Sequence, residues 1–128
     1  MKVVEIAFTG YPVTDIPRAQ KFYEATLGLA PARKFEDSSF CWIEYDIGPT
    51  TLAIAKGIPD WNPSSSGGST AFEVDDFAAA VSAVKAGGYK FLKEPFDAPA
   101  CSMAVVADPD GNAVTIHKRK QCAGPHGA

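Results

Sequence analysis

The sequence predicts an α+β domain in which one strand–helix–strands unit occurs twice. Two helical segments begin at Asp15 and Asp76, which stand 61 positions apart in a chain of 128 residues. Strand patterns follow each helix, and residues 57–68, rich in Pro, Ser and Gly, separate the two halves. Because self-similarity at half the chain length is typical of a duplicated unit, we expect two modules of the same topology.

Both helices carry start and stop signals. An Asp at the N-cap accepts hydrogen bonds from backbone N–H groups of the first turn, and Pro17 is tolerated in that turn. Glycines at 28 and at 87–88 provide the C-terminal stops. Between these signals, apolar residues recur at helical spacing: Ile16, Ala19, Phe22, Tyr23 and Leu27 in the first helix, and Phe77, Ala80, Val81 and Val84 in the second.

Strand patterns account for most of the remaining chain. In the first half we predict strands at 40–47 and 51–56, preceded by a strand with Val4, Ile6 and Phe8 on its apolar face. In the second half the first strand falls on 70–72, and later strands on 89–93, 102–107 and 113–118, the last two joined by the turn sequence 108–112. Residues 10–12 look like an insertion in the first copy, which makes Glu5 correspond to Ser69.

Composition excludes several classes of protein. Hydrophobic residues make up 46% and charged residues 21%, as in an ordinary globular domain. The net charge of −3 gives no indication of nucleic-acid binding. No apolar run is longer than that at 103–107, which has strand length and is too short for a membrane span. Glu5 interrupts what a signal peptide would need as an apolar core, and the three cysteines lack metal spacing. We therefore expect a cytoplasmic protein with reduced thiols, no nucleic acid and no membrane.

Strand alternation predicts which side chains share a polar face. Successive residues of a strand point to opposite sides, so residues next to the apolar positions line the other surface. If helices cover the apolar faces, that surface is concave and holds Glu5, Trp42, Glu44, Glu73, Thr115 and His117. A histidine among carboxylates is suited to metal binding or to proton transfer.

Three motifs carry a resemblance to a known family. They are residues 13–29 (VTDIPRAQKFYEATLGL), residues 71–76 (AFEVDD) with the glycines at 87–88, and residues 108–112 (DPDGN). In this order, and on a two-fold repeat, the sequence resembles the vicinal oxygen chelate (VOC) superfamily, which includes glyoxalase I, bleomycin-resistance proteins and extradiol dioxygenases. The resemblance implies two paired βαβββ modules with curved sheets around a shared cavity, commonly in a homodimer. It gives a single glyoxalase-like domain at 1–120, with module one at 1–56, a linker at 57–68, module two at 69–118 and a flexible tail at 121–128.

The resemblance also locates the usual metal ligands. Metal-dependent members carry His, Gln or Glu at four positions, which fall here on Glu5 or Phe8, on Ala53, on Ser69 and on Thr115. Alanine cannot coordinate a metal, and hydroxyls are poor ligands for a divalent ion. We therefore expect that the usual site is absent. A displaced divalent metal bound by His117 with Glu5, Glu44 or Glu73 is the alternative.

The sequence thus supports two functional hypotheses. The first is a binding protein for a small organic molecule, held in the inter-sheet cavity by Glu5, Trp42, Glu73 and Thr115. The second is a lyase, isomerase or dioxygenase acting on a small carbonyl or aromatic compound, with His117 as acid–base group paired with Glu44 or Glu5.

For two further residues the sequence leaves two possible roles open. Trp61 either lines a binding groove or packs on its own domain, and Cys101 is either a reactive or an incidental thiol. Cys41 is expected in the core.

Overall fold

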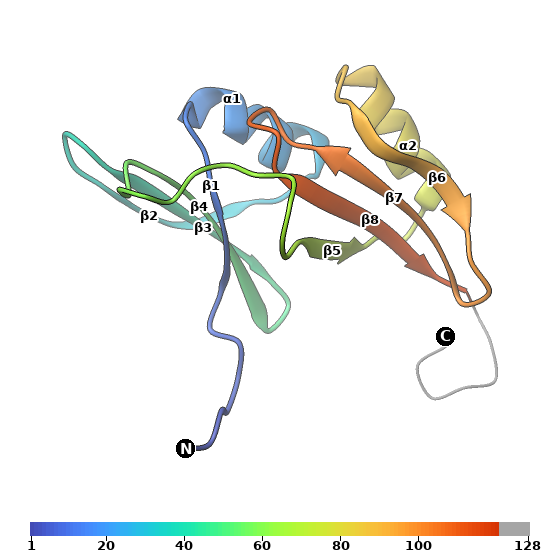
Figure 1. Ribbon diagram of the computed structural model, residues 1–128, viewed down its shortest axis with the longest axis horizontal. Coiled ribbons are helices and arrows are strands. Elements are labelled where there is room, and N and C mark those ends of the chain that lie inside the picture. Colours follow the sequence, from blue (N-terminus) through green and yellow to red (C-terminus); the bar gives the residue numbers. More distant parts are fainter. Residues whose placement is uncertain (121–128) are drawn as a thin grey trace. The chain divides into compact units, whose positions relative to one another are not determined.

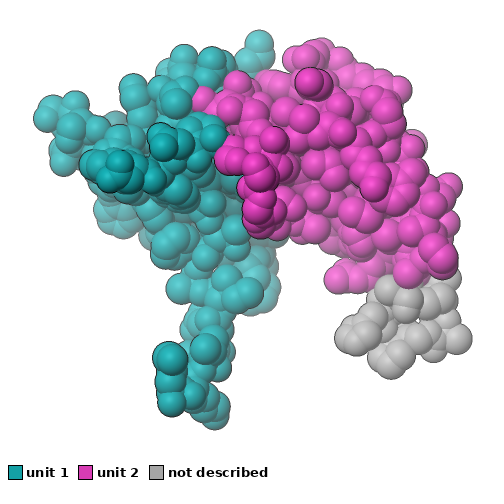
Figure 2. All heavy atoms as spheres, viewed as in Figure 1, with its two compact units in different colours: residues 1–63 teal, residues 64–128 magenta. Residues whose placement is uncertain are grey.

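The computed structural model describes residues 1–120, which fall into two compact units, residues 1–63 and residues from 64 onward (Figure 2). Each unit contains one helical segment and one four-stranded mixed sheet, so the predicted α+β class is confirmed. The segment 121–128, predicted to be a flexible tail, lies outside the described residues. Within residues 1–120, no helix has the length and apolar character needed to span a membrane.

The first unit contains β1 (Thr9–Pro12), a helix formed by α1 (Ile16–Gln20) and the π-helical segment η1 (Lys21–Thr26), and three further strands (Figure 1). These are β2 (Pro31–Glu36), β3 (Cys41–Ile47) and β4 (Thr50–Lys56). The sheet order is β1-β4-β3-β2; β1 is parallel to β4, and the other pairs are antiparallel. Strand β2 was not predicted from the sequence.

The second unit repeats this topology. It contains β5 (Thr70–Glu73), α2 (Phe77–Ala86), β6 (Phe91–Asp97), β7 (Cys101–Ala107) and β8 (Ala113–Arg119), with the sheet order β5-β8-β7-β6. Again the first strand is parallel to the last, and the others pair antiparallel. Helix α2 contacts β7 and β8, and Figure 1 shows it on one side of this sheet.

Strand register gives the correspondence between the two copies. Thr9 pairs with Leu52 and Thr70 pairs with Val114, so Thr9 corresponds to Thr70, 61 positions later. The two N-caps have the same separation. The predicted insertion at residues 10–12 is therefore wrong, because these residues form β1 itself. Phe8, and not Glu5, corresponds to Ser69.

The predicted first strand was also misplaced. Residues 1–8 form no strand, and Val3, Val4 and Ile6 are 71–80% exposed. In Figure 1 this segment runs away from β1 as an extended chain. Strand β4 begins only two residues before Leu52, the partner of Thr9, so it offers little backbone with which earlier residues could pair. An alternating apolar pattern needs such a partner to become a buried strand.

The predicted N-caps are confirmed. The carboxylate of Asp15 accepts the Arg18 N–H at 3.0 Å, and that of Asp76 accepts the Ala79 N–H at 3.0 Å. The first helical segment is one residue longer than the second when each is measured from its Asp cap to the next glycine with positive φ, which is Gly28 in the first unit and Gly88 in the second. The wider turns of the π-helical segment η1 accommodate the extra residue, since there the Leu27 N–H donates to the Phe22 carbonyl five residues back.

Apart from the misplaced first strand, the apolar faces of β3, β4, β7 and β8 form the cores. In the first unit Cys41, Ile43 and Tyr45 of β3 are at most 8% exposed, and Leu52 and Ile54 of β4 at most 2%. In the second unit the corresponding buried residues are Ala104, Val106, Val114 and Ile116. These residues face the helical segments, so the opposite side of each sheet, called here the open face, holds the alternate residues.

Candidate functional site: the open faces of the two sheets

The open face of the first sheet is defined by register. Glu44 of β3 pairs with Arg33 of β2 on one side and with Ala53 of β4 on the other, and Ala53 pairs with Gly10 of β1. Directly paired residues point to the same side of a sheet. A second row, one step along the strands, contains Phe35, Trp42, Ala55 and Pro12.

Arg33 holds two carboxylates on this face. Its Nε donates to Glu44 at 2.5 Å, and its terminal nitrogens donate to both oxygens of Asp46. The indole N–H of Trp42 donates to the second oxygen of Glu44 at 2.9 Å, and the Thr51 hydroxyl donates to Asp46 at 2.9 Å. Hydrogen bonds from Arg33, then from Trp42, lower the pKa of Glu44, and those from Arg33 and Thr51 lower the pKa of Asp46. Both groups are therefore ionised at neutral pH.

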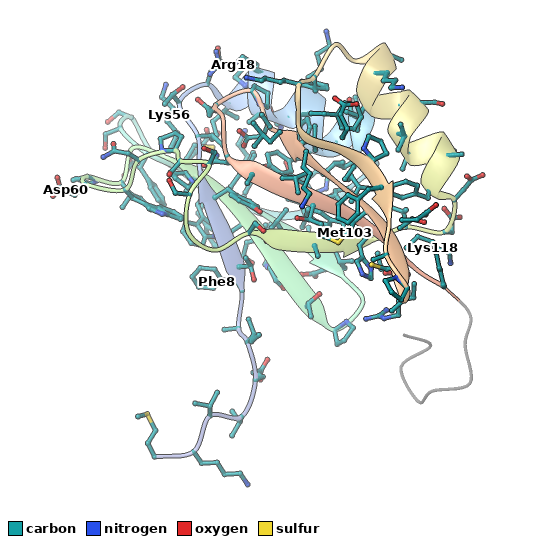
Figure 3. All side chains as sticks on the ribbon, turned by 45° about the vertical axis from the view of Figure 1, so that its right-hand side comes forward. Phe8, Arg18, Lys56, Asp60, Met103 and Lys118 are labelled. Atoms are coloured by element: carbon teal, nitrogen blue, oxygen red, sulfur yellow. The ribbon has the colours of Figure 1, made fainter. Side chains whose placement is uncertain are left out.

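Aromatic rings lie beside this network. The rings of Phe8 and Trp42 meet edge to face, with centroids 5.1 Å apart. The Trp61 ring covers Gly10, since a Cβ at residue 10 would lie 2.8 Å from Cη2 of that indole and 3.7 Å from the Phe8 ring. Phe8 is 47% exposed and is labelled at the start of β1 in Figure 3. The glycine at position 10 thus leaves the space that Trp61 occupies.

The open face of the second sheet has its own polar row. Glu73 of β5 pairs with His117 of β8, which pairs with Met103 of β7, and Met103 pairs with Phe96 of β6. Figure 3 labels Met103 within this sheet. The adjacent row contains Ala71, Thr115, Val105 and Lys93, and the Lys93 ammonium lies 4.6 Å from the centre of the Phe96 ring.

Glu73 and His117 are hydrogen-bonded. One carboxylate oxygen lies 2.5 Å from His117 Nδ1, and the other accepts the backbone N–H of Arg119 at 2.7 Å. The Arg119 guanidinium lies 3.7 Å from the first oxygen. Desolvation opposes ionisation of Glu73, but the bonds from the Arg119 N–H and from His117 outweigh it, so its pKa is lowered.

The structure places the six predicted site residues in three groups. Trp42 and Glu44 are hydrogen-bonded to each other on the first sheet. Glu73 and His117 are hydrogen-bonded on the second, with Thr115 two residues before His117 on the same strand and 5% exposed. Glu5 lies in the exposed segment before β1. The hydrogen-bonded carboxylate of His117 is therefore Glu73, where the sequence suggested Glu44 or Glu5.

Several residues at these faces were missed from the sequence. Arg33, which joins two carboxylates, lies in β2, all of whose residues are exposed and give no apolar alternation. The register partners Met103 and Phe96 depend on pairings between strands and carry no local signal. Trp61 was recognised, and its position over Gly10 agrees with the interpretation that the linker packs on its own unit.

The residues at the usual metal positions do not fit a metal. With the corrected correspondence these positions hold Phe8 and Ser69 before the first strand of each unit, and Ala53 and Thr115 on the last. Phenylalanine and alanine supply no donor atom, and two hydroxyls are poor ligands for a divalent ion. Nor do residues 1–120 bring together three or more His, Cys, Asp or Glu side chains in a group that could hold a metal ion.

The two units define the class of the protein: paired strand–helix–three-strand modules, with polar and aromatic side chains on the sheet face that the helix leaves open. The chain belongs to the Glyoxalase/Bleomycin resistance protein/Dioxygenase superfamily, whose family model matches residues 5–116. The VOC resemblance stated from the motifs is confirmed.

Known relatives agree with this assignment. The chain is 28% identical over 127 residues to a lactoylglutathione lyase of Haemophilus influenzae, covering 91% of this chain and 94% of that protein. It is 27% identical to a probable lactoylglutathione lyase of Vibrio cholerae, covering 91% of each. Among solved structures, TnmS3, an antibiotic binding protein from Streptomyces sp. CB03234, has a TM-score of 0.77 at 23% identity, covering 94% of this chain and 99% of that chain.

Proposed function

We propose that this protein binds a small organic molecule with a flat aromatic part on the open faces of its sheets, and that it does so without the usual metal. The observation that carries the proposal is the group formed by Phe8, Trp42 and Trp61 beside the ionised pair of Arg33 and Glu44. Aromatic side chains offer large apolar contact area, and the fixed charges orient a ligand.

The donor chemistry supports the metal-free part of the proposal. Phe8 and Ala53 cannot coordinate a metal, and Ser69 and Thr115 supply only hydroxyls. No step of the function therefore passes through a metal at these positions. A solved structure of the same fold is named an antibiotic binding protein, and a relative by sequence is named a lyase. A binding function is therefore as compatible with this fold as a lyase activity.

Tryptophan fluorescence tests the binding surface directly, because the chain contains only two Trp residues. Trp61→Phe leaves Trp42 as the single reporter, and Trp42→Phe leaves Trp61. We expect saturable quenching of both single-Trp proteins on titration with bleomycin, chosen from the family's name and for its flat heteroaromatic rings. The absence of saturable quenching in both, with a native circular dichroism spectrum, would refute the aromatic group as a binding surface.

Metal dependence is tested separately. The untagged protein is incubated with Zn²⁺, Ni²⁺ or Mn²⁺, freed of excess ion, and analysed for bound metal and for conversion of the methylglyoxal–glutathione hemithioacetal to lactoylglutathione. We expect neither stoichiometric metal nor metal-dependent turnover. One metal per chain together with turnover would overturn the metal-free part of the proposal, including the displaced site considered for Glu5 and His117.

A second candidate function is favoured by the Glu73–His117 hydrogen bond. A histidine held by a carboxylate is a common arrangement for general acid–base chemistry, and an enzyme of the lyase, isomerase or dioxygenase type would use His117 in that role. If the protein turns over the hemithioacetal without metal, His117→Ala should reduce the rate by about 10²-fold or more. Unchanged turnover in this variant would remove the catalytic assignment.

We further propose that the protein works in the cytoplasm as a homodimer. Cys41 and Cys101 are free thiols, as expected in a reducing compartment. Val3, Val4 and Ile6 are largely exposed before β1, and exposed apolar groups favour association. Sedimentation equilibrium of the full chain should give twice the monomer mass, whereas a monomer at micromolar concentration would refute the dimer.

A further inference from the structure

The His117 ring has a fixed hydrogen-bond partner from the neighbouring strand. Glu73 and His117 are direct partners in the parallel pairing of β5 with β8, and the carboxylate oxygen lies 2.5 Å from Nδ1. The His117 side chain is 23% exposed, so the ring is neither buried in the core nor free in solvent. The second oxygen of Glu73 is held by the Arg119 N–H on the same strand as the histidine. These bonds fix both partners to the backbone of the sheet.

The charge of Glu73 determines where the imidazole proton lies. With its pKa lowered, Glu73 is a carboxylate at neutral pH and can only accept hydrogen bonds. The proton between the two groups must therefore reside on Nδ1 of His117. In a neutral imidazole one nitrogen donates and the other accepts, so Nε2 is left as the acceptor.

On the side away from Glu73, the open face presents a thioether, an aromatic ring and one ammonium group. His117 pairs with Met103 of β7, which pairs with Phe96 of β6. The Lys93 ammonium lies over the Phe96 ring at 4.6 Å. A thioether and an aromatic ring in line with an imidazole acceptor suit a flat ligand that carries a hydroxyl group.

We propose that Glu73 is a positioning residue that holds His117 in the Nδ1–H form, so that Nε2 accepts the hydroxyl proton of a bound phenol or enol. When the hydroxyl is acidic, its O–H bond breaks, a bond forms between Nε2 and the proton, and a phenolate remains beside the imidazolium. The electron pair of the O–H bond stays on the ligand oxygen, so no other reactant is needed. This inference names the chemical class of ligand and rests on the proposed binding function.

The form of the imidazole is measured by ¹⁵N NMR, without any ligand. The chain contains two His residues, so ¹⁵N-histidine labelling in a His126→Ala background leaves His117 as a single reporter. At a pH where the ring is neutral, we expect a protonated nitrogen at Nδ1 and an unprotonated one at Nε2. Glu73→Ala should shift the population toward Nε2–H. Glu94→Gln, which alters an exposed carboxylate of the same sheet, should leave it unchanged.

A second measurement tests the ligand class with 4-nitrophenol, whose absorbance distinguishes phenol from phenolate. We expect binding to raise the phenolate fraction, and His117→Ala and Glu73→Ala each to weaken binding about fivefold or more, the effect of one hydrogen bond, while Glu94→Gln has no effect. Circular dichroism must show that all variants are folded; Glu73→Gln replaces Glu73→Ala if the latter is not.

Three results would overturn the inference. They are an Nε2–H tautomer of His117 in the parent chain, a tautomer that does not change when Glu73 is replaced, and 4-nitrophenol binding that does not depend on His117. Failure of 4-nitrophenol to bind at all would overturn the assigned ligand class. Bleomycin quenching of Trp42 and Trp61 reports on the first sheet, so it distinguishes these failures from failure of the proposed binding function.

Discussion

Tyr45 forms a hydrogen bond whose energetic effect can be isolated. Its ring is fully buried on the helix side of β3, and its hydroxyl donates to a carboxylate oxygen of Glu24 in η1 at 2.7 Å. The same oxygen accepts a bond from the Gln20 side chain at 3.1 Å. Tyr45→Phe deletes the hydroxyl and keeps the ring, so it creates almost no cavity. The change therefore measures the bond between η1 and the sheet.

The expected loss follows from the charge of the acceptor. A hydrogen bond to a charged group contributes roughly 1.5–3 kcal/mol. Because Gln20 remains as a donor to Glu24, we expect Tyr45→Phe to lower the free energy of unfolding by about 2 kcal/mol at pH 7. In a double-mutant cycle with Glu24→Gln, the two changes should be non-additive, since they act on the same bond.

The pH dependence provides a second signature. Burial, followed by the hydrogen bond and the charge of Glu24, raises the pKa of Tyr45 above its ordinary value. The native state then retains a phenolic proton that the unfolded state loses above about pH 10. The stabilisation from Tyr45 is complete below that pH and decreases as pH rises further, by about 1.4 kcal/mol per unit. Tyr45→Phe should remove this part of the alkaline loss of stability.

Urea unfolding followed by circular dichroism, at pH 7 and at a series of alkaline pH values, measures both effects. The reasoning is refuted if Tyr45→Phe is as stable as the parent chain at pH 7, or if its stability falls with the same slope above pH 10. An additive cycle with Glu24→Gln would show that the two side chains are not coupled.

Three other predictions test the backbone, the N-terminal segment and the charge network. Gly57→Ala should lower the free energy of unfolding by about 3 kcal/mol or more, because φ is 96° and the new Cβ would lie 2.1 Å from a backbone carbonyl oxygen. Gly48→Ala, at φ 57° in open space, should lower it by about 1 kcal/mol. Equal losses for the two variants in urea unfolding would contradict this difference. Removal of residues 1–7 should weaken dimerisation but change the free energy of unfolding of the monomer by less than about 0.5 kcal/mol, since the apolar side chains of this segment are exposed. A larger loss in the monomer would mean that the segment is packed on its own unit. Arg33→Met should raise the pKa of Glu44 toward its ordinary range, so that the stability contributed by the ionised Glu44 is lost at a higher pH on acidification. ¹³C NMR of the Glu44 carboxyl group measures this pKa, and an unchanged pKa would refute the role of Arg33.

The fold was largely predictable because its signals are local. The Asp N-caps, the glycine stops and the alternation in β3 and β8 depend on a few neighbouring residues, and the structure confirms them. Strand β2 was missed because all its residues are exposed, so burial left no pattern in its sequence. The first strand was misplaced because Val4, Ile6 and Phe8 alternate as well as a true strand does, and only the register with β4 shows that it begins at Thr9.

The candidate site was predictable as faces but not as pairs. Alternation correctly put Trp42 and Glu44 on one face and His117 on the face of Thr115. The carboxylate that contacts His117 is determined by the pairing of β5 with β8. Glu73 and His117 are 44 residues apart in the sequence. Such register is set by the packing of whole strands, and no property of either residue alone reveals it.

The position of the Trp61 ring over Gly10 has a consequence for the chain between the units. Residue 61 is attached to the first unit through that ring, while the backbone N–H of Ser64 donates to the side chain of Asn112 in the second unit at 3.0 Å. Only Asn62 and Pro63 lie between these attachments, and proline has a fixed φ. Within the linker predicted over 57–68, Trp61 thus stays with the first unit and Ser64 with the second, so the junction at Asn62 and Pro63 is where inserted residues would leave both attachments intact.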